Sequence, residues 1–132
     1  ACLQDVLPLE EFMGWDGIDQ IKANMRGWTT TTLTELRFCH HRREGNRDGS
    51  RKRAWEAQGH AAYYVGYRWW YLLFRALHRA RSERAALAMV PAYATDALRR
   101  APRCADSAVR THLRRTQTLS GLPARMREAT GR

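Results

Sequence analysis

The chain has 132 residues, enough for one modest domain and too few for two. A hydrophobic content of 44% is typical of a globular chain, and the formal net charge is +10. No stretch reaches the roughly 20 apolar residues of a membrane-spanning helix, and the three cysteines form no C-x-x-C pair, so we expect neither a disulfide framework nor a structural zinc site.

The charge is unevenly distributed along the chain. Residues 1–36 hold six acids and two bases, a net −4, whereas residues 37–132 hold 21 bases and seven acids, a net +14. All bases except Lys22 and Lys52 are arginines. We expect the acidic front to hold any chemistry and the basic remainder to face an anionic partner, either nucleic acid or an anionic membrane.

The first segment, "ACLQDVLPLEEFM", indicates a helix end or turn that runs into an acidic loop. The next, "GWDGIDQIKANMRGW", predicts a short helix. Asp16 is a good N-cap and Asp19 could complete a capping box, while Gly27 is the expected stop. The apolar stripe of this helix consists of Ile18, Ile21 and Met25.

Four consecutive threonines then favour extended structure. We predict two short strands, Trp28–Thr31 and Arg37–His41, around a turn. The loop that follows, "RREGNRDGSRKR", suits a segment that covers a diphosphate or a phospholipid head group, and it suits a solvated surface equally well. Its six basic residues are Arg42, Arg43, Arg47, Arg51, Lys52 and Arg53.

The remainder predicts helices. One runs from Ala54 to about Ala80; a second, Arg84 to Arg100, is interrupted or kinked at Pro91 and ended by Pro102; a third runs from about Asp106 to Leu119. The first of these is aromatic on almost every side and carries arginines between its Tyr and Trp residues. Such a mixture is typical of a helix in a membrane interface, although an ordinary core is the alternative interpretation.

Three segments together resemble a known family. "GWDGIDQIKANMRGW", "FCHHRREG" and "AAYYVGYRWWYLLFRAL" are similar to the C-terminal part of family 2 glycosyltransferases, which have the GT-A fold. The resemblance is closest to a bacterial branch with the motifs G-W-D-x-I-D-E-I-K-A and H-H-R-x-x-G. Gln20 replaces the usual acid after Asp19. The likeness covers nearly the whole chain and is strongest over residues 14–45 and 61–77.

The resemblance implies a mainly helical chain with a small β element, the C-terminal fragment of an α/β GT-A enzyme of polysaccharide biosynthesis. Residues 1–53 would be the acceptor-side end of the catalytic domain, and residues 54–132 a helical, membrane-associated region. The parent enzyme would transfer a sugar from a nucleotide-sugar to a glycan or lipid-linked acceptor with inversion. Its nucleotide site and its D-x-D motif, which holds Mg²⁺ or Mn²⁺, lie in a half that these residues lack. We therefore expect the fragment to bind no metal and to be inactive alone.

By the same resemblance, Asp16 aligns with the carboxylate that acts as general base. A plain N-cap is the competing interpretation of Asp16, and the two roles are compatible because one oxygen can cap while the other faces the cleft. The resemblance also implies a set of substrate-binding residues. Within it, Asp19 suits a capping role better than a second catalytic one, and at most one of the two adjacent histidines can face the site if they lie on a strand. The set is Trp15, Asp19, His40, His41, Arg42 and Arg43.

Two other classes of function remain open. A non-enzymatic basic helical module could bind nucleic acid through its phosphates, and a helical protein could bind an anionic membrane surface without any chemistry. Either would explain the charge but not "GWDGID", and no RRM, KH or zinc-finger signature occurs. We expect a cytoplasmic location, peripheral at the inner face of the cytoplasmic membrane if the membrane interpretation holds.

Overall fold

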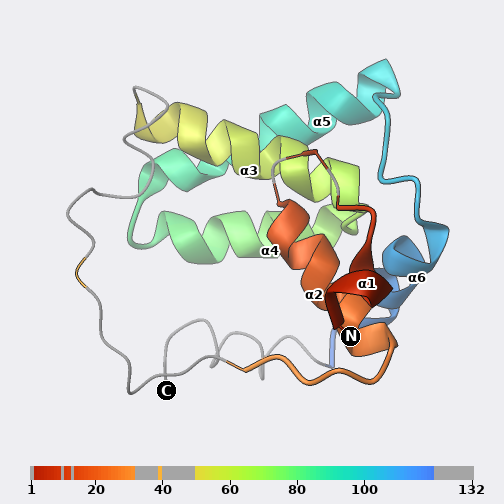
Figure 1. Ribbon diagram of the computed structural model, residues 1–132. Helices are drawn as coiled ribbons and strands as arrows, with labels where there is room; N and C mark the ends of the chain where they lie inside the picture. The colour runs from red at the N-terminus through yellow and green to blue at the C-terminus, as the bar shows by residue number, and fades with distance from the viewer. Residues whose placement is uncertain (1, 10, 13, 32–38, 40–49, 121–132) are drawn as a thin grey trace.

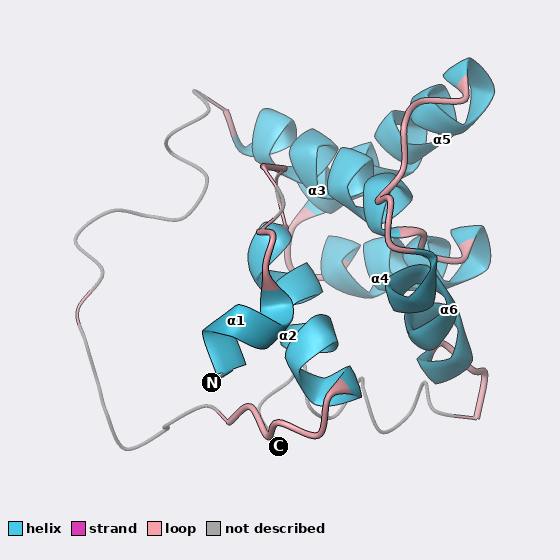
Figure 2. Ribbon diagram, turned by 45° about the vertical axis from the view of Figure 1, so that its right-hand side comes forward, coloured by secondary structure: helices cyan, strands magenta, loops and turns pink. Residues whose placement is uncertain are grey.

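The regular elements of the chain are helices. The computed structural model describes residues 2–9, 11–12, 14–31, 39 and 50–120, and no strand occurs in these ranges (Figures 1 and 2). The mainly helical prediction is therefore confirmed for the part that the structure describes. The elements are α1 (Cys2–Val6), α2 (Trp15–Met25), α3 (Arg51–Val65), α4 (Trp69–Ala80), the 3-10 helix η2 (Arg84–Ala88), α5 (Met89–Arg99) and α6 (Ser107–Thr116).

Two groups of helices make up the structure. In the first, α5 packs on α3 and also contacts α4, and η2 packs against α3, α4 and α5 (Figure 1). In the second, α1 packs on α2 and α2 packs on α6, near the turn that joins α3 to α4 (Figures 1 and 2). None of the described helices is both long enough and apolar enough to cross a bilayer.

Each group has its own cluster of buried side chains. The first cluster joins α3, α4, η2 and α5 and consists of Ala62, Leu72, Ala76, Ala86 and Met89. The second consists of Ile18, Val65, Cys104, Val109 and Leu113. The Tyr67 side chain packs against both clusters. Because Ile18 of α2 is fully buried against α3 and α6, the front of the chain is held in place by its C-terminal helices.

The prediction of one continuous helix from Ala54 to Ala80 is wrong. The helix ends at Gly66, which has a φ of +92°, a value that glycine adopts without strain. The N–H groups of Gly66 and Tyr67 donate to the carbonyls of Tyr63 and Ala62, at 3.0 and 2.9 Å. The break lets α4 fold back, so that Leu72 is buried in the same cluster as Ala62, whereas a single helix with apolar residues all round would leave most of them in water.

The first predicted strand, Trp28–Thr31, is also wrong, because this segment is a loop after α2. The Thr30 hydroxyl accepts a hydrogen bond from Gln20 at 2.9 Å and donates to Asn24 at 3.3 Å, which ties the loop to α2. An isolated strand cannot pair its own backbone groups, so threonine propensity alone does not produce one. The second predicted strand lies outside the described residues except for Cys39, which has no regular structure.

Several predicted helix boundaries agree with the structure. Gly27, with a φ of +83°, ends α2: its N–H donates to the carbonyl of Asn24 and that of Trp28 to the carbonyl of Ala23, both at 3.1 Å. The side chain of Asp106 caps α6 by accepting from the N–H groups of Ala108 and Val109. Of the predicted stripe on α2, Ile18 is buried and Ile21 packs against the core, but Met25 is 41% exposed.

Pro91 does not kink a continuous helix. It is the third residue of α5, where its missing N–H would have no partner within the helix. The change from 3-10 to α geometry comes earlier, where η2 ends at Ala88. At the other end α5 stops at Arg99, and Arg100 adopts the left-handed conformation before Pro102.

Candidate functional site

A cleft of about 360 Å³ opens between α2, α3, α4 and α6. Its charged and polar lining comes from four parts of the chain: Asp16 and Gln20 on α2, Gln58 on α3, Tyr67 in the α3–α4 turn, and Arg75 on α4. The rest of the lining is apolar or glycine: Gly14, Gly17, Ile21, Ala61, Ala62, Val65 and Leu113. Polar and apolar surface contribute about equally to its lining, so the cleft combines apolar walls with several convergent polar groups that could bind a polar ligand.

Asp16 lies in the first turn of α2, and the prediction that it caps this helix is wrong. The N-cap is Gly14, which has a φ of +92°, and no side chain caps the helix. The Gly14 carbonyl accepts from the N–H groups of Gly17 and Ile18, so the helix begins at Trp15, one residue before Asp16. The Asp16 carboxylate is exposed at the cleft and makes no hydrogen bond or ion pair with a described residue. The carboxylate lies at the helix end that favours negative charge.

Two contacts hold α2 in this place. Ile18 anchors one side of the helix in the core between α3 and α6. On another side the buried ammonium of Lys22 donates to the carbonyls of Pro8, at 3.0 Å, and Val6, at 3.4 Å. These bonds satisfy a buried cation with backbone oxygens and fasten α2 to the chain before it. The position of Asp16 is thus fixed by the helix that carries it.

Arg75 is the second charged residue of the cleft. It is half-buried, its guanidinium carbon lies 5.9 Å from the centre of the Tyr67 ring, and its Nη2 donates to Oε1 of Gln58 at 3.4 Å. No ion pair joins it to a described carboxylate, Asp16 included. The cleft therefore presents a carboxylate and a guanidinium that do not neutralise each other by direct contact, and each is available to a polar ligand.

The sequence interpretation missed Arg75, although a signal existed. Arg75 follows Leu72 by three residues, so on a helix the two share a side. Leu72 is 1% exposed, which means that this side faces the protein. An arginine on the buried side of an apolar helix is a better candidate for a ligand contact than the fully exposed arginines around it.

Of the predicted site residues, Asp16 is the one that the structure brings to the cleft. Asp19 is half-buried one turn into α2 and is not part of the cleft lining. Trp15 begins α2, but its side chain, like His40, His41, Arg42 and Arg43, lies outside what the structure describes. Their assignment to substrate binding stays a prediction.

The predicted basic loop is helical at its end. Ser50 caps α3 by accepting from the N–H of Arg53, so Arg51, Lys52 and Arg53 form the first turn of this helix. Arg51 forms an ion pair with Glu83 at 3.5 Å, and Lys52 with Glu56 at 3.5 Å. The other three basic residues of the loop, Arg42, Arg43 and Arg47, lie outside the described residues.

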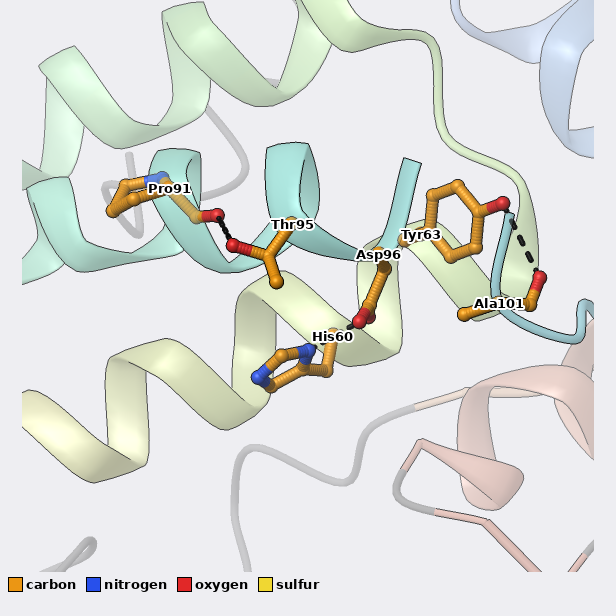
Figure 3. Close-up of polar contacts among 6 residues, drawn as sticks. All are labelled: His60, Tyr63, Pro91, Thr95, Asp96 and Ala101. Atoms are coloured by element: carbon orange, nitrogen blue, oxygen red, sulfur yellow. Dashed lines mark hydrogen bonds and ion pairs between the residues drawn. The ribbon is translucent and has the colours of Figure 1, made fainter. Parts of the chain in front are cut away.

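A separate polar cluster joins α3 to α5 (Figure 3). Nδ1 of His60 lies 2.6 Å from Oδ2 of Asp96, and the Tyr63 hydroxyl donates to the Ala101 carbonyl at 3.2 Å. The neighbouring Thr95 hydroxyl donates to the Pro91 carbonyl of its own helix, so it is not aligned with His60 as a nucleophile would be. We interpret this cluster as a structural link between the two helices.

The divalent metal implied by the family resemblance has no set of ligands in the described residues. They contain no group of three or more His, Cys, Asp or Glu side chains that could hold a metal ion. The His60–Asp96 pair supplies two such side chains, fewer than a protein metal site needs.

Comparison of the chain with protein-family models, with curated proteins and with solved structures finds no match in any of the three.

Proposed function

We propose that this chain is the acceptor-side end of an inverting family 2 glycosyltransferase and that Asp16 is its general base. The observation that supports this proposal is the position of Asp16. The carboxylate that the motif resemblance assigns as the base lines a cleft large enough for a sugar ring, and it is not used to cap its own helix. Arg75, Gln58 and Tyr67 supply the hydrogen-bonding groups on the other walls.

The reaction proposed for this cleft is a single displacement. The oxygen of the acceptor hydroxyl attacks the anomeric carbon of the donor sugar from the face opposite the nucleotide diphosphate. A new C–O bond forms, the bond to the diphosphate oxygen breaks, and the diphosphate leaves with the electron pair. Asp16 takes the proton of the attacking hydroxyl, which increases the nucleophilicity of its oxygen as the bond forms. Arg75 and Gln58 would orient the acceptor by hydrogen bonds, so that one hydroxyl faces Asp16.

The test of this proposal is a sugar-transfer assay on two proteins, the 132-residue chain alone and the chain joined to whatever its reading frame encodes upstream. With a panel of labelled nucleotide-sugars, we expect transfer by the joined protein and none by the chain alone, because the donor-binding half is a separate part of the fold in this family. Transfer by the chain alone would contradict the fragment assignment. An upstream region without a D-x-D motif, together with no transfer by the joined protein, would contradict the transferase assignment.

Arg75 gives a prediction about acceptor binding. We expect Arg75→Gln to raise the KM for the acceptor at least about tenfold, because a hydrogen bond from a charged donor contributes on the order of 1.5–3 kcal/mol. The turnover number should change far less, since Arg75 contacts no reacting atom in this proposal. Steady-state kinetics of the joined enzyme measure both values.

The matched control is Arg79→Gln. Arg79 lies one turn further along α4, is exposed and does not line the cleft. The Arg79→Gln substitution removes the same charge from the same helix. The KM of this variant for the acceptor should therefore stay within about twofold of the wild-type value. Equal effects of the two substitutions would show that Arg75 acts only through the net charge of the chain.

A further inference from the structure

An apolar groove of about 470 Å³ lies between α4 and α5, away from the cleft of Asp16. Leu72 and Tyr93 are its more deeply buried members, and Trp69 and Leu98 form its rim. The rim residues are 67% and 85% exposed, the highest values among the large apolar side chains of the described residues. The remaining lining residues are Leu73, Val90, Ala94 and Ala97. Large apolar side chains exposed around an apolar groove are typical of a surface that binds a protein, a membrane or a ligand.

The side chains that line the groove offer few hydrogen-bonding groups to an occupant, and none in its interior is free. Their polar side-chain groups are the Tyr93 hydroxyl, which donates to the Tyr67 carbonyl at 2.8 Å, and the indole N–H of Trp69 at the exposed rim. Burial raises the pKa of Tyr93, although Arg103 and Arg114 oppose the shift, so this hydroxyl stays protonated as a donor. A specific protein partner needs polar contacts that set its position along such a groove. The fluid hydrocarbon of a lipid bilayer needs no such polar contacts.

The charges around the groove are almost all positive. Residues 68–100 contain seven arginines and two acids. Both acids contact residues of α3: Glu83 forms an ion pair with Arg51, and Asp96 forms a hydrogen bond with His60. Exposed Arg99 directly follows Leu98 of the rim, and exposed Arg84 begins η2, the element that leads into α5. The surface therefore combines an apolar centre with an unneutralised basic border.

We propose that the α4–α5 groove is a membrane-docking surface that binds the interface of an anionic lipid bilayer. Trp69 and Leu98 insert at the level of the head groups and upper acyl chains, where tryptophan is favoured, and the arginines contact anionic head groups. This proposal places the docking surface between α4 and α5, whereas the sequence predicted it along one continuous aromatic helix. In the structure the aromatic residues of α3 are turned inward: Tyr63 is 4% exposed and Tyr64 stacks on Phe12. The inference stands independently of the proposed transferase activity.

The first experiment is co-sedimentation of the whole chain with vesicles of phosphatidylcholine, with and without about 30% phosphatidylglycerol. We expect binding to the anionic vesicles and weak binding to the neutral ones. The double substitution Trp69→Ser with Leu98→Ser should lower the partition coefficient roughly tenfold or more, because it removes the inserted apolar groups. Both positions are mostly exposed, so the fold should be retained, which circular dichroism checks.

The matched control is Phe74→Ser with Leu119→Ser. These residues are 48% and 66% exposed and do not line the groove. This control should leave binding within about twofold. A second pair of variants tests whether the position of the arginines matters or only their charge. The double substitution Arg84→Gln with Arg99→Gln should weaken binding to anionic vesicles more than Arg26→Gln with Arg115→Gln does. The latter removes the same charge, but from α6 and the end of α2.

Several results would overturn the proposal. One is the absence of binding to anionic vesicles near physiological salt, above all if the chain binds a duplex or single-stranded oligonucleotide under the same conditions. Another is an equal loss of binding in the groove variants and the controls, which would indicate adsorption by net charge alone. A third is a dimer in analytical ultracentrifugation that the Trp69 and Leu98 substitutions dissociate, which would make a second copy of the chain the occupant.

Discussion

Replacing Asp16 with Asn should reduce turnover of the joined transferase about a hundred- to ten-thousand-fold, the range typical of the loss of a general base. The amide has nearly the same shape as the carboxylate but cannot accept a proton at neutral pH. Since Asp16 is exposed and neither caps α2 nor pairs with a described residue, the substitution should leave the fold and the affinity for the donor almost unchanged. Single-turnover kinetics separate the chemical step from binding.

Glu11→Gln is the control for charge. Glu11 is an exposed acid of the same acidic front but is not part of the cleft, so its loss changes the net charge by the same amount. We expect near wild-type turnover from this variant. If Asp16→Asn also turns over at close to the wild-type rate, then Asp16 is not the base, and its position at the cleft has another explanation.

The largest expected effect on stability comes from Gly59→Ala. Gly59 lies where α3 and α5 touch, and a Cβ there would overlap the carbonyl oxygen of Met89 and lie 2.9 Å from both the Cα of Met89 and the Cβ of Ala92. Backbone cannot move aside as a flexible side chain can, so the helices must separate. We expect a net loss of about 2 kcal/mol, because overpacking costs typically about 1–3 kcal/mol or more and alanine returns up to about 1 kcal/mol of helix propensity.

Gly17→Ala is the matched control for this prediction. Gly17 lies inside α2, and a Cβ there would meet nothing within 4 Å. The same substitution should therefore raise stability by up to about 1 kcal/mol through helix propensity alone. Urea denaturation followed by circular dichroism compares the two variants. A Gly59→Ala protein as stable as the wild type would mean that α3 and α5 are not in close contact.

Local signals in the sequence were enough to predict much of the secondary structure. The start of a helix at about Asp106 and Gly27 as the end of α2 are both confirmed, because the residues that set these boundaries act on backbone groups only a few residues away. Gly66 shows the limit of the same method. A glycine within a helical pattern can be tolerated or can end the helix, and here the outcome depends on whether α4 gains more by packing on η2 and α5 than by continuing α3.

The candidate site likewise depends partly on local sequence and partly on tertiary structure. The sequence by itself, through a short motif, pointed to Asp16 as a reactive carboxylate. The tertiary structure decided that Asp16 shares a cleft with Gln58, Arg75 and Leu113, which are more than 40 residues away along the chain. Such neighbours are brought together by burial of Ile18, Val65 and Leu113 in one cluster. The hydrophobic effect acts between apolar side chains however far apart they are along the chain, and it has no preferred direction. A residue pattern within a single helix therefore does not specify which distant side chains will face the same space.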